Sequence, residues 1–388
     1  MEHLSSFDIQ SRVRLVFGEN SLERLGELAR ELPAKRALIV TDSGIVEAGH
    51  VARAITILEA IGVEAVVFAE VHENPTTEDV TRCLEVAKAC KIDAFIGLGG
   101  GSSMDTAKGC NFLLTNGGEM RDYWGVNKAS KPMLPLIAIP TTAGTGSECQ
   151  SFALISDAQT HHKMACGDVK AAPRIALLDP VLTVSQPRGV TVCTGIDAIT
   201  HAAETAVTNK RTPYSRLYSR EAFRLTINTL PIVLAEPSNI AARGQMLLGA
   251  AFAGIAIEAS MLGAAHSMAN PLTAHYGTTH GQAVGLALPH VVRFNAQSPP
   301  ILALYHDLAL YARLADTQDS ANIALEKLLF RLQETLETAG LATRLTELGV
   351  EEESIPLLAK EAAGQWTANF NPRPVSQKDF ERLYGEAF

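Results

Sequence analysis

The sequence predicts two domains, an α/β, Rossmann-like domain at residues 1–184 and an all-α domain at residues 185–388. Short apolar runs alternate with amphipathic stretches in the first half, and such alternation is typical of βαβ units that form a parallel sheet. After the segment Leu177-Leu178-Asp179-Pro180, Leu, Ala, Glu and Arg recur at helical spacing, and no convincing strand pattern is found up to Phe388. A length of 388 residues allows two or three domains of roughly 150 residues. The change of pattern puts the boundary near Val184.

Each expected strand of the first domain is a short apolar run, and amphipathic helices lie between the runs. The expected strands are 37–40, 64–68, 94–98 and 136–139, and the expected helices are 51–61 and 77–89. In the second domain, 323–339 shows the spacing of a surface helix. The stretch 246–265 carries one charge, Glu258, and approaches the length of a membrane span. Its glycines and polar flanks favour a helix buried in a protein core.

Composition excludes several classes of protein. The 33 Lys plus Arg against 42 Asp plus Glu give a net charge of −9, which argues against nucleic acid as the main partner. An apolar content of 47% excludes a disordered chain. No apolar run stands near the N-terminus, so we expect no targeting peptide, no membrane partner and a cytoplasmic location. The six cysteines contain no CxxC pair, which favours reduced thiols.

A glycine-rich turn follows the expected strand 94–98. Residues 97–108 read GLGGGSSMDTAK, with Gly99, Gly100 and Gly101 standing directly before Ser102. Adjacent glycines let the backbone approach a phosphate closely, and the helix that follows offers unpaired N–H groups and partial positive charge. The segment is not a GxGxxG motif, because Ser102 occupies the last position. The turn therefore indicates a nucleotide phosphate site, with a purely structural turn as the alternative.

Two more loops follow expected strands in the same way. Residues 140–148 read PTTAGTGSE, and their hydroxyls suit hydrogen bonds to ribose, phosphate or carboxamide groups. Asp42 follows the strand 37–40, where a carboxylate could accept hydrogen bonds from an adenosine ribose. Such a carboxylate would favour NAD over NADP by repelling a 2′-phosphate. By itself, an Asp in this position is more often a turn or capping residue.

Four residues of the second domain could form a metal site. Asp197 and His201 are four residues apart, so they share one helix face about one turn from each other. His266 and His280 follow downstream. One carboxylate and three imidazoles suit a divalent ion such as Fe(II) or Zn(II). A histidine beside apolar residues is more often structural, so spacing alone leaves both interpretations open.

Taken together, these motifs resemble the iron-containing, or group III, alcohol dehydrogenase family. The matching motifs stand in family order, namely Gly99-Gly100-Gly101-Ser102 with Asp105 and Lys108, residues 140–148, Thr194-Gly195-x-Asp197-Ala198-x-x-His201, and Leu288-Pro289-His290. The resemblance runs from about residue 13 to residue 291 and fades in the C-terminal helices. It implies the dehydroquinate synthase-like fold, an α/β nucleotide domain plus an all-helical domain with the site between them.

The resemblance also implies roles for individual residues. The implied cofactor contacts are Asp42, Asn74, Gly99, Gly100, Gly101, Ser102, Asp105, Thr141, Thr142, Thr145 and Lys163. The implied metal ligands are Asp197, His201, His266 and His280. Phe152 would face the substrate, where its ring suits a small aliphatic or aromatic alcohol better than a polyol. Glu204 and Thr200 are candidates for orienting the ligand imidazoles.

One position departs from the family pattern. Where members commonly carry a histidine that relays a proton, four residues after His266, this chain has Asn270. An amide is neither a general acid nor a general base near neutral pH. We therefore expect His275 or water to relay the proton, with a surface role for His275 as the alternative. His161 and His162 lie in a polar turn and are expected to be exposed.

The sequence thus predicts a metal-dependent, NAD(P)-linked alcohol dehydrogenase or aldehyde reductase that prefers NAD, uses Fe(II) or Zn(II) and forms a homodimer or larger homo-oligomer. Hydride would pass between nicotinamide C4 and an alcohol or carbonyl polarised by the metal. One alternative is a glycerol-dehydrogenase-like or sugar-synthase-like enzyme of the same fold. The other is a catalytically weakened protein that binds nucleotide and metal as a sensor or assembly subunit.

Overall fold

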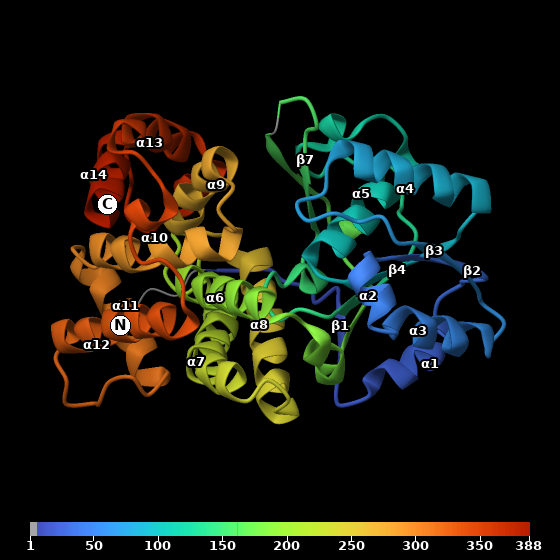
Figure 1. Cartoon of the computed structure of the whole chain (residues 1–388), viewed down its shortest axis with the longest axis horizontal. Coiled ribbons are helices and arrows are strands. Elements are labelled where there is room, and N and C mark those ends of the chain that lie inside the picture. Colours follow the sequence, from blue (N-terminus) through green and yellow to red (C-terminus); the bar gives the residue numbers. More distant parts are fainter. Residues whose placement is uncertain (1–5, 161) are drawn as a thin grey trace. The chain divides into compact units, whose positions relative to one another are not determined.

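The structure, a computed structural model, describes residues 6–160 and 162–388 (Figure 1). Contacts divide the described chain into an α/β unit, residues 9–186, and a helical unit, residues 187–388 together with residues 6–8. The sequence-based boundary of 184/185 lies two residues before this division. His161 lies outside the described residues, and His162 is exposed.

The α/β unit is built on a six-stranded parallel sheet in the order β1-β9-β6-β4-β2-β3. Its strands are β1 (Arg14–Phe17), β2 (Arg36–Val40), β3 (Glu64–Phe68), β4 (Ala94–Gly99), β6 (Leu136–Pro140) and β9 (Ile175–Leu178). The four strands expected from the sequence are present within one residue at each end. A parallel sheet buries both faces, so its strands read as continuous apolar runs.

Helices cover both faces of this sheet, as expected for a doubly wound α/β fold (Figure 1). The helices are α1 (Leu25–Arg30), α2 (Ser43–Glu47), α3 (His50–Glu59), α4 (Thr77–Cys90) and α5 (Gly101–Asn116). On one face, Ile39 and Ile96 pack with residues of α1 and α3, such as Leu28. On the other, Leu38 and Phe95 pack with residues of α4 and α5. Because successive strand residues point to opposite faces, one strand feeds both cores.

A second, smaller sheet was not expected from the sequence. It has the order β5-β8-β7, with β5 (Gly125–Val126) parallel to β8 (Lys163–Gly167), and β8 antiparallel to β7 (Phe152–Ser156). The residues of β8, KMACG, have little intrinsic strand preference, so pairing on both sides holds the segment extended. The sheet places Phe152 directly after the loop that follows β6.

The regular elements of the helical unit are all helices, which together with the parallel sheet confirms the predicted fold class. The α-helices are α6 (Arg188–Thr205), α7 (Pro213–Ala235), α8 (Ile240–Ser260), α9 (Ala264–Tyr276), α10 (His280–Asn295), α11 (Pro299–Tyr311), α12 (Ala321–Ala339), α13 (Ile355–Gly364) and α14 (Gln377–Ala387). Helix α7 packs against both α6 and α8, and α10 packs against α6 and α9.

The apolar stretch 246–265 is not one helix. Helix α8 ends at Ser260, Met261 takes a positive φ of 64°, and α9 begins at Ala264. By length and composition α8 could cross a membrane, but 67% of its apolar window is buried inside the protein, as expected of a core helix. The break matters because it lets α9 start beside α6.

Candidate functional site

Three histidine side chains of the helical unit converge on one carboxylate oxygen of Asp197. Asp197 and His201 lie on α6, His266 is the third residue of α9, and His280 is the first residue of α10. The Nε2 atoms of His201, His266 and His280 lie 3.2, 3.5 and 3.8 Å from Asp197 Oδ1. The His201 and His266 rings stack with centroids 4.8 Å apart. The structure therefore brings together the four residues predicted to hold a metal.

The spacing of these donors fits a shared cation better than hydrogen bonds among them. Two of the three distances exceed the usual range for an N–H···O bond, about 2.7–3.2 Å. Ligand atoms at roughly 2.0–2.2 Å from one metal stand about 3.0–3.6 Å from each other. The His201 and His266 distances fall in this range, and the His280 distance lies just above it. Asp197 Oδ1 and His266 Nε2 are both buried without a hydrogen-bond partner. Buried polar atoms are normally paired, so this pair of orphaned atoms indicates a site for an ion.

Glu204 fixes the orientation of His266. Its Oε2 lies 2.6 Å from His266 Nδ1, and its Oε1 accepts a 2.7 Å hydrogen bond from the N–H of Ala265. The first bond directs His266 Nε2 toward Asp197, as carboxylates commonly do for metal-binding histidines. The second bond satisfies an unpaired N–H in the first turn of α9 and places negative charge at its positive end. Thr200, the other sequence candidate, instead donates to the carbonyl of Ile196.

The electrostatics of the cluster favour added positive charge. Burial would raise the pKa of the Asp197 carboxyl, but the three histidines outweigh it and hold that pKa well below its usual range. Burial would lower the pKa of His266, but Glu204 and Asp197 outweigh it and raise that pKa to about 9. Two buried carboxylates thus face three imidazoles, an arrangement that a divalent cation would neutralise.

Close helix packing depends on glycines beside these ligands. A Cβ added to Gly281 would lie 2.0 Å from the carbonyl oxygen of Cys193 on α6. Only glycine therefore lets α10 approach α6 at the point where His280 begins α10. A Cβ added to Gly263 would lie 3.1 Å from Glu204 Oε1. The sequence alone did not indicate these two roles, because the contacts join segments far apart in the chain.

In the α/β unit, three loops meet at the carboxyl ends of adjacent strands. Strand β2 pairs with β3 on one side and with β4 on the other, and β4 pairs with β6. The chain after β2 turns toward one face and the chain after β4 toward the other. This is a topological switch point, where open α/β sheets bind nucleotides. The loops beginning at Asp42, Gly100 and Thr141 all start here.

The glycine turn is packed against the loop of residues 140–148, called here the hydroxyl loop. The Thr141 N–H donates to the Gly99 carbonyl at 2.9 Å. A Cβ added to Gly101 would lie 2.7 Å from Thr145 Cγ2, and one added to Gly100 would lie 3.5 Å from Thr142 Cγ2. Gly99 has φ +152°, which L side chains rarely adopt. These glycines leave the backbone open to close approach at the start of α5, and Ser102 is partly exposed beside them.

The remaining predicted cofactor residues form local contacts in the same unit. Asp42 caps α2 by accepting from the Ile45 N–H at 3.1 Å, the capping role that the sequence left open beside a ribose contact. Lys163 Nζ donates to Asn74 Oδ1 at 3.3 Å. Asp105 is buried and accepts a 2.7 Å hydrogen bond from the Ser147 hydroxyl. Asp105 therefore acts through a loop contact rather than as an open ligand group.

Phe152, Asn270 and His275 occupy three different environments. The Phe152 ring packs over Gly167, where an added Cβ would lie 2.4 Å from Cε1. Asn270 donates from Nδ2 to Gln365 Oε1 at 2.9 Å. His275 lies in the last turn of α9, where its Nε2 is 2.9 Å from Glu361 Oε2. The His275 side chain is 38% exposed, so it does not join the buried metal-site cluster formed by Asp197, His201, His266 and His280.

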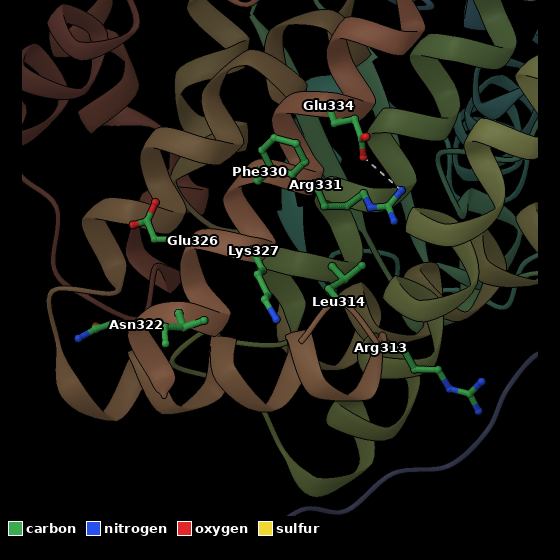
Figure 2. A pocket seen from close by; sticks show the side chains of 9 residues that line it. Arg313, Leu314, Asn322, Glu326, Lys327, Phe330, Arg331 and Glu334 are labelled. Atoms are coloured by element: carbon green, nitrogen blue, oxygen red, sulfur yellow. Dashed lines mark ion pairs between the residues drawn. The ribbon is translucent and has the colours of Figure 1, made fainter. Parts of the chain in front are cut away.

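A separate groove lies against α12, with a volume of about 830 Å³ (Figure 2). Phe330, which is 69% exposed, and the ion pair between Arg331 and Glu334 line it. None of the residues predicted for the site lines this groove. Its open, charged wall differs from the enclosed donors of the metal-site cluster.

Both halves of the chain match family models. Residues 13–180 match the model described as iron-containing alcohol dehydrogenase, and residues 191–388 match the Fe-containing alcohol dehydrogenase family, C-terminal. The chain is 34% identical over 375 residues to the NAD-dependent methanol dehydrogenase of Bacillus methanolicus, covering 96% of this chain and 97% of that protein. It is 32% identical to the 1,3-propanediol dehydrogenase of Citrobacter freundii, covering 96% of each chain. A crystal structure of 1,3-propanediol oxidoreductase superposes with a TM-score of 0.95 at 31% identity, covering 99% of this chain and 100% of that chain.

Proposed function

This chain belongs to the iron-containing alcohol dehydrogenase family, and we propose that it interconverts a short primary alcohol and its aldehyde, with NAD as the hydride carrier. The observation that carries the proposal is the convergence of three imidazoles on Asp197 Oδ1. The relatives named for methanol and 1,3-propanediol support a short primary alcohol as the substrate class.

The metal-site cluster and Glu204 would hold the metal. A bound divalent ion supplies Lewis-acid polarisation of the substrate oxygen, and NAD supplies the nicotinamide that exchanges a hydride with carbon. Asp197 contributes the negative charge, and the three histidines contribute neutral nitrogen donors. Glu204 holds the His266 ring so that Nε2 faces the other donors. We propose Fe(II) or Zn(II), which share this preference for mixed nitrogen and oxygen ligands.

The loops at the switch point would bind the dinucleotide. The open backbone of Gly99, Gly100 and Gly101 at the start of α5 suits the pyrophosphate, because N–H groups and the helix dipole favour an anion there. The Asp42 carboxylate suits the ribose hydroxyls of NAD and repels the 2′-phosphate of NADP. Thr142 and Thr145, both partly exposed, would line the same site. The local positive potential of these amides explains how an acidic protein of net charge −9 binds an anion.

The proton route would differ from that of relatives with a histidine at position 270. We propose that His275 relays the proton, supported by its position on α9, its exposure and its carboxylate partner Glu361. A His275→Ala variant should then show a changed pH–rate profile while keeping its metal. An unchanged profile with metal bound would assign the relay to water and make His275 a surface residue.

Substrate size would be limited by Phe152. Its ring lies over Gly167, and we propose that it forms the wall that excludes polyols. A Phe152→Ala variant should gain kcat/KM for bulkier aldehydes relative to short ones. An unchanged ratio would remove Phe152 from the substrate site.

The direct test of the proposed function is NADH oxidation with a panel of short aldehydes, ketones and glycerol-like substrates. Protein stripped of metal should be inactive and should recover turnover with Fe(II) or Zn(II). Turnover of short aldehydes well above that of polyols would support the proposal, and a preference for polyols would favour a glycerol-dehydrogenase-like activity. Tight NADH binding without turnover under either metal would contradict the proposal and favour a binding protein.

A further inference from the structure

A lysine is completely buried beneath the candidate cofactor loops. Lys108, on the second turn of α5, has no exposed surface, and lysines are almost never fully buried unless paired. Its Nζ donates to the carbonyl oxygen of Ser147 at 2.7 Å, to Ser147 Oγ at 2.7 Å and to the carbonyl oxygen of Phe152 at 2.9 Å. Three donors thus meet three oxygens, the full capacity of an ammonium group.

The partners of Lys108 belong to separate segments of the α/β unit. Lys108 and Asp105 stand on the helix that starts at the glycine turn, and Ser147 lies at the end of the hydroxyl loop. Phe152 opens β7. The Ser147 hydroxyl donates onward to Asp105 Oδ1, which is 3.9 Å from Lys108 Nζ. One side chain therefore connects the segment that the proposed function assigns to the pyrophosphate, the loop that lines the same dinucleotide site, and the residue assigned to substrate.

The hydroxyl loop is anchored to the glycine turn at its start and to α5 at its end. At its start, the Thr141 N–H binds the Gly99 carbonyl, and at its end Ser147 binds Lys108. Between these anchors, Thr145 already lies against Gly101, where no room remains for even a methyl group. Two anchors and one close contact together fix the position of the loop relative to α5. Removal of the Lys108 ammonium breaks the link from α5 to Phe152 and leaves the Ser147–Asp105 hydrogen bond at this end of the loop.

We propose that Lys108 is a positioning residue that sets the spacing among the glycine turn, the hydroxyl loop and Phe152, and thereby sets both NAD affinity and aldehyde size preference. This inference rests on the proposed function of those loops. Lys108 acts through Ser147 and Phe152 and, being wholly buried, does not itself contact cofactor. Lysine fits this role because its flexible stem ends in three donors that can bind oxygens in different directions.

The experiment compares Lys108→Met with Ser147→Ala and a matched control. Methionine keeps the unbranched shape and removes all three donors, whereas Ser147→Ala removes the hydroxyl and leaves both carbonyl acceptors. Lys170→Met is the control, because Lys170 Nζ also binds a backbone carbonyl, that of Ala129 at 3.0 Å, and an aspartate, but in a different part of the same unit. NADH dissociation constants, aldehyde size profiles and urea unfolding are measured for each metal-loaded protein.

Lys108→Met should weaken NADH binding about tenfold or more and change the ratio of kcat/KM between a short and a bulky aldehyde. Ser147→Ala should show a smaller change of the same kind, and Lys170→Met should leave both properties within about twofold of wild type. If Lys108→Met fails to unfold cooperatively, Ser147→Ala carries the test. A folded variant with wild-type NADH affinity and size profile overturns the inference. Wild-type protein that binds no NADH refutes the proposed function instead.

Discussion

Replacement of Glu204 by alanine should reduce metal affinity without touching a metal ligand. The change removes the acceptor 2.6 Å from His266 Nδ1 and the acceptor of the Ala265 N–H. Outer carboxylates of this kind typically contribute 10- to 100-fold in metal affinity, which corresponds to about 1.4–2.7 kcal/mol. Loss of the capping contact to α9 should add about 0.5–2 kcal/mol of destabilisation. A Glu204→Gln variant keeps only one acceptor oxygen and should fall between alanine and wild type.

The assay is competition for Zn(II) with a chromophoric chelator, run beside urea unfolding. Asp179→Ala is the matched control, because Asp179 is also fully buried and accepts backbone N–H bonds from Asn20, Leu22 and Val181, but in the α/β unit. This control should lose stability and keep its metal affinity. If Glu204→Ala binds Zn(II) within about twofold of wild type, the carboxylate does not orient His266 for a metal.

Three other predictions follow from single contacts. Gly281→Ala would place a Cβ 2.0 Å from the Cys193 carbonyl oxygen. In urea unfolding and chelator competition we therefore expect about 1–3 kcal/mol of destabilisation and weaker metal binding. The control Gly189→Ala, which has open space around it, should change neither the stability nor the metal affinity. Burial raises the pKa of Glu148 from 4.5 to about 7, because the folded protein favours the neutral carboxyl. This stabilisation of the folded state, about 3 kcal/mol, is fully present below about pH 4.5 and is lost as pH rises through about 7. Glu148→Gln should remove that pH dependence, and equal slopes for both proteins in urea unfolding across this range would contradict it. Asp42→Ser keeps a capping oxygen for α2 and removes the negative charge, so kcat/KM with NADPH should rise about tenfold in steady-state assays. An unchanged preference between NADH and NADPH would exclude Asp42 from the ribose site.

The sequence predicted those parts of the fold whose residues carry a local pattern. Strands β2, β4 and β6 contribute buried residues to both faces of the sheet, so they read as apolar runs. Strand β3, at the sheet edge, is only partly buried but keeps the apolar run AVVF. Strand β1 has only four residues and an exposed Phe17, and β8 is held by its partners rather than by its own preference. The break at Met261 was also missed, because an apolar sequence does not mark where a buried helix ends.

The candidate site shows the same division between local and long-range information. The four-residue spacing of Asp197 and His201 was enough to place them on one helix face. The arrival of His266 at the Asp197 oxygen depends on Glu204, which is 62 residues away in the sequence. The arrival of His280 depends on Gly281, whose close neighbour is the backbone of Cys193 on α6. The buried donors of Lys108 likewise reach partners 39 and 44 residues away. A sequence pattern shows which residues are available, but tertiary packing decides which of them meet.

The central claim is that the cluster around Asp197 holds a divalent metal needed for NAD-linked turnover. The most direct measurement is metal content and NADH oxidation with a short aldehyde, made on wild-type protein and on Asp197→Ala after chelator treatment and reloading with Fe(II) or Zn(II). We expect reloaded wild-type protein to regain NADH oxidation with the aldehyde. We expect Asp197→Ala to bind NADH but neither to retain metal nor to oxidise NADH with the aldehyde. Full turnover by stripped wild-type protein, or by Asp197→Ala without bound metal, would contradict the claim.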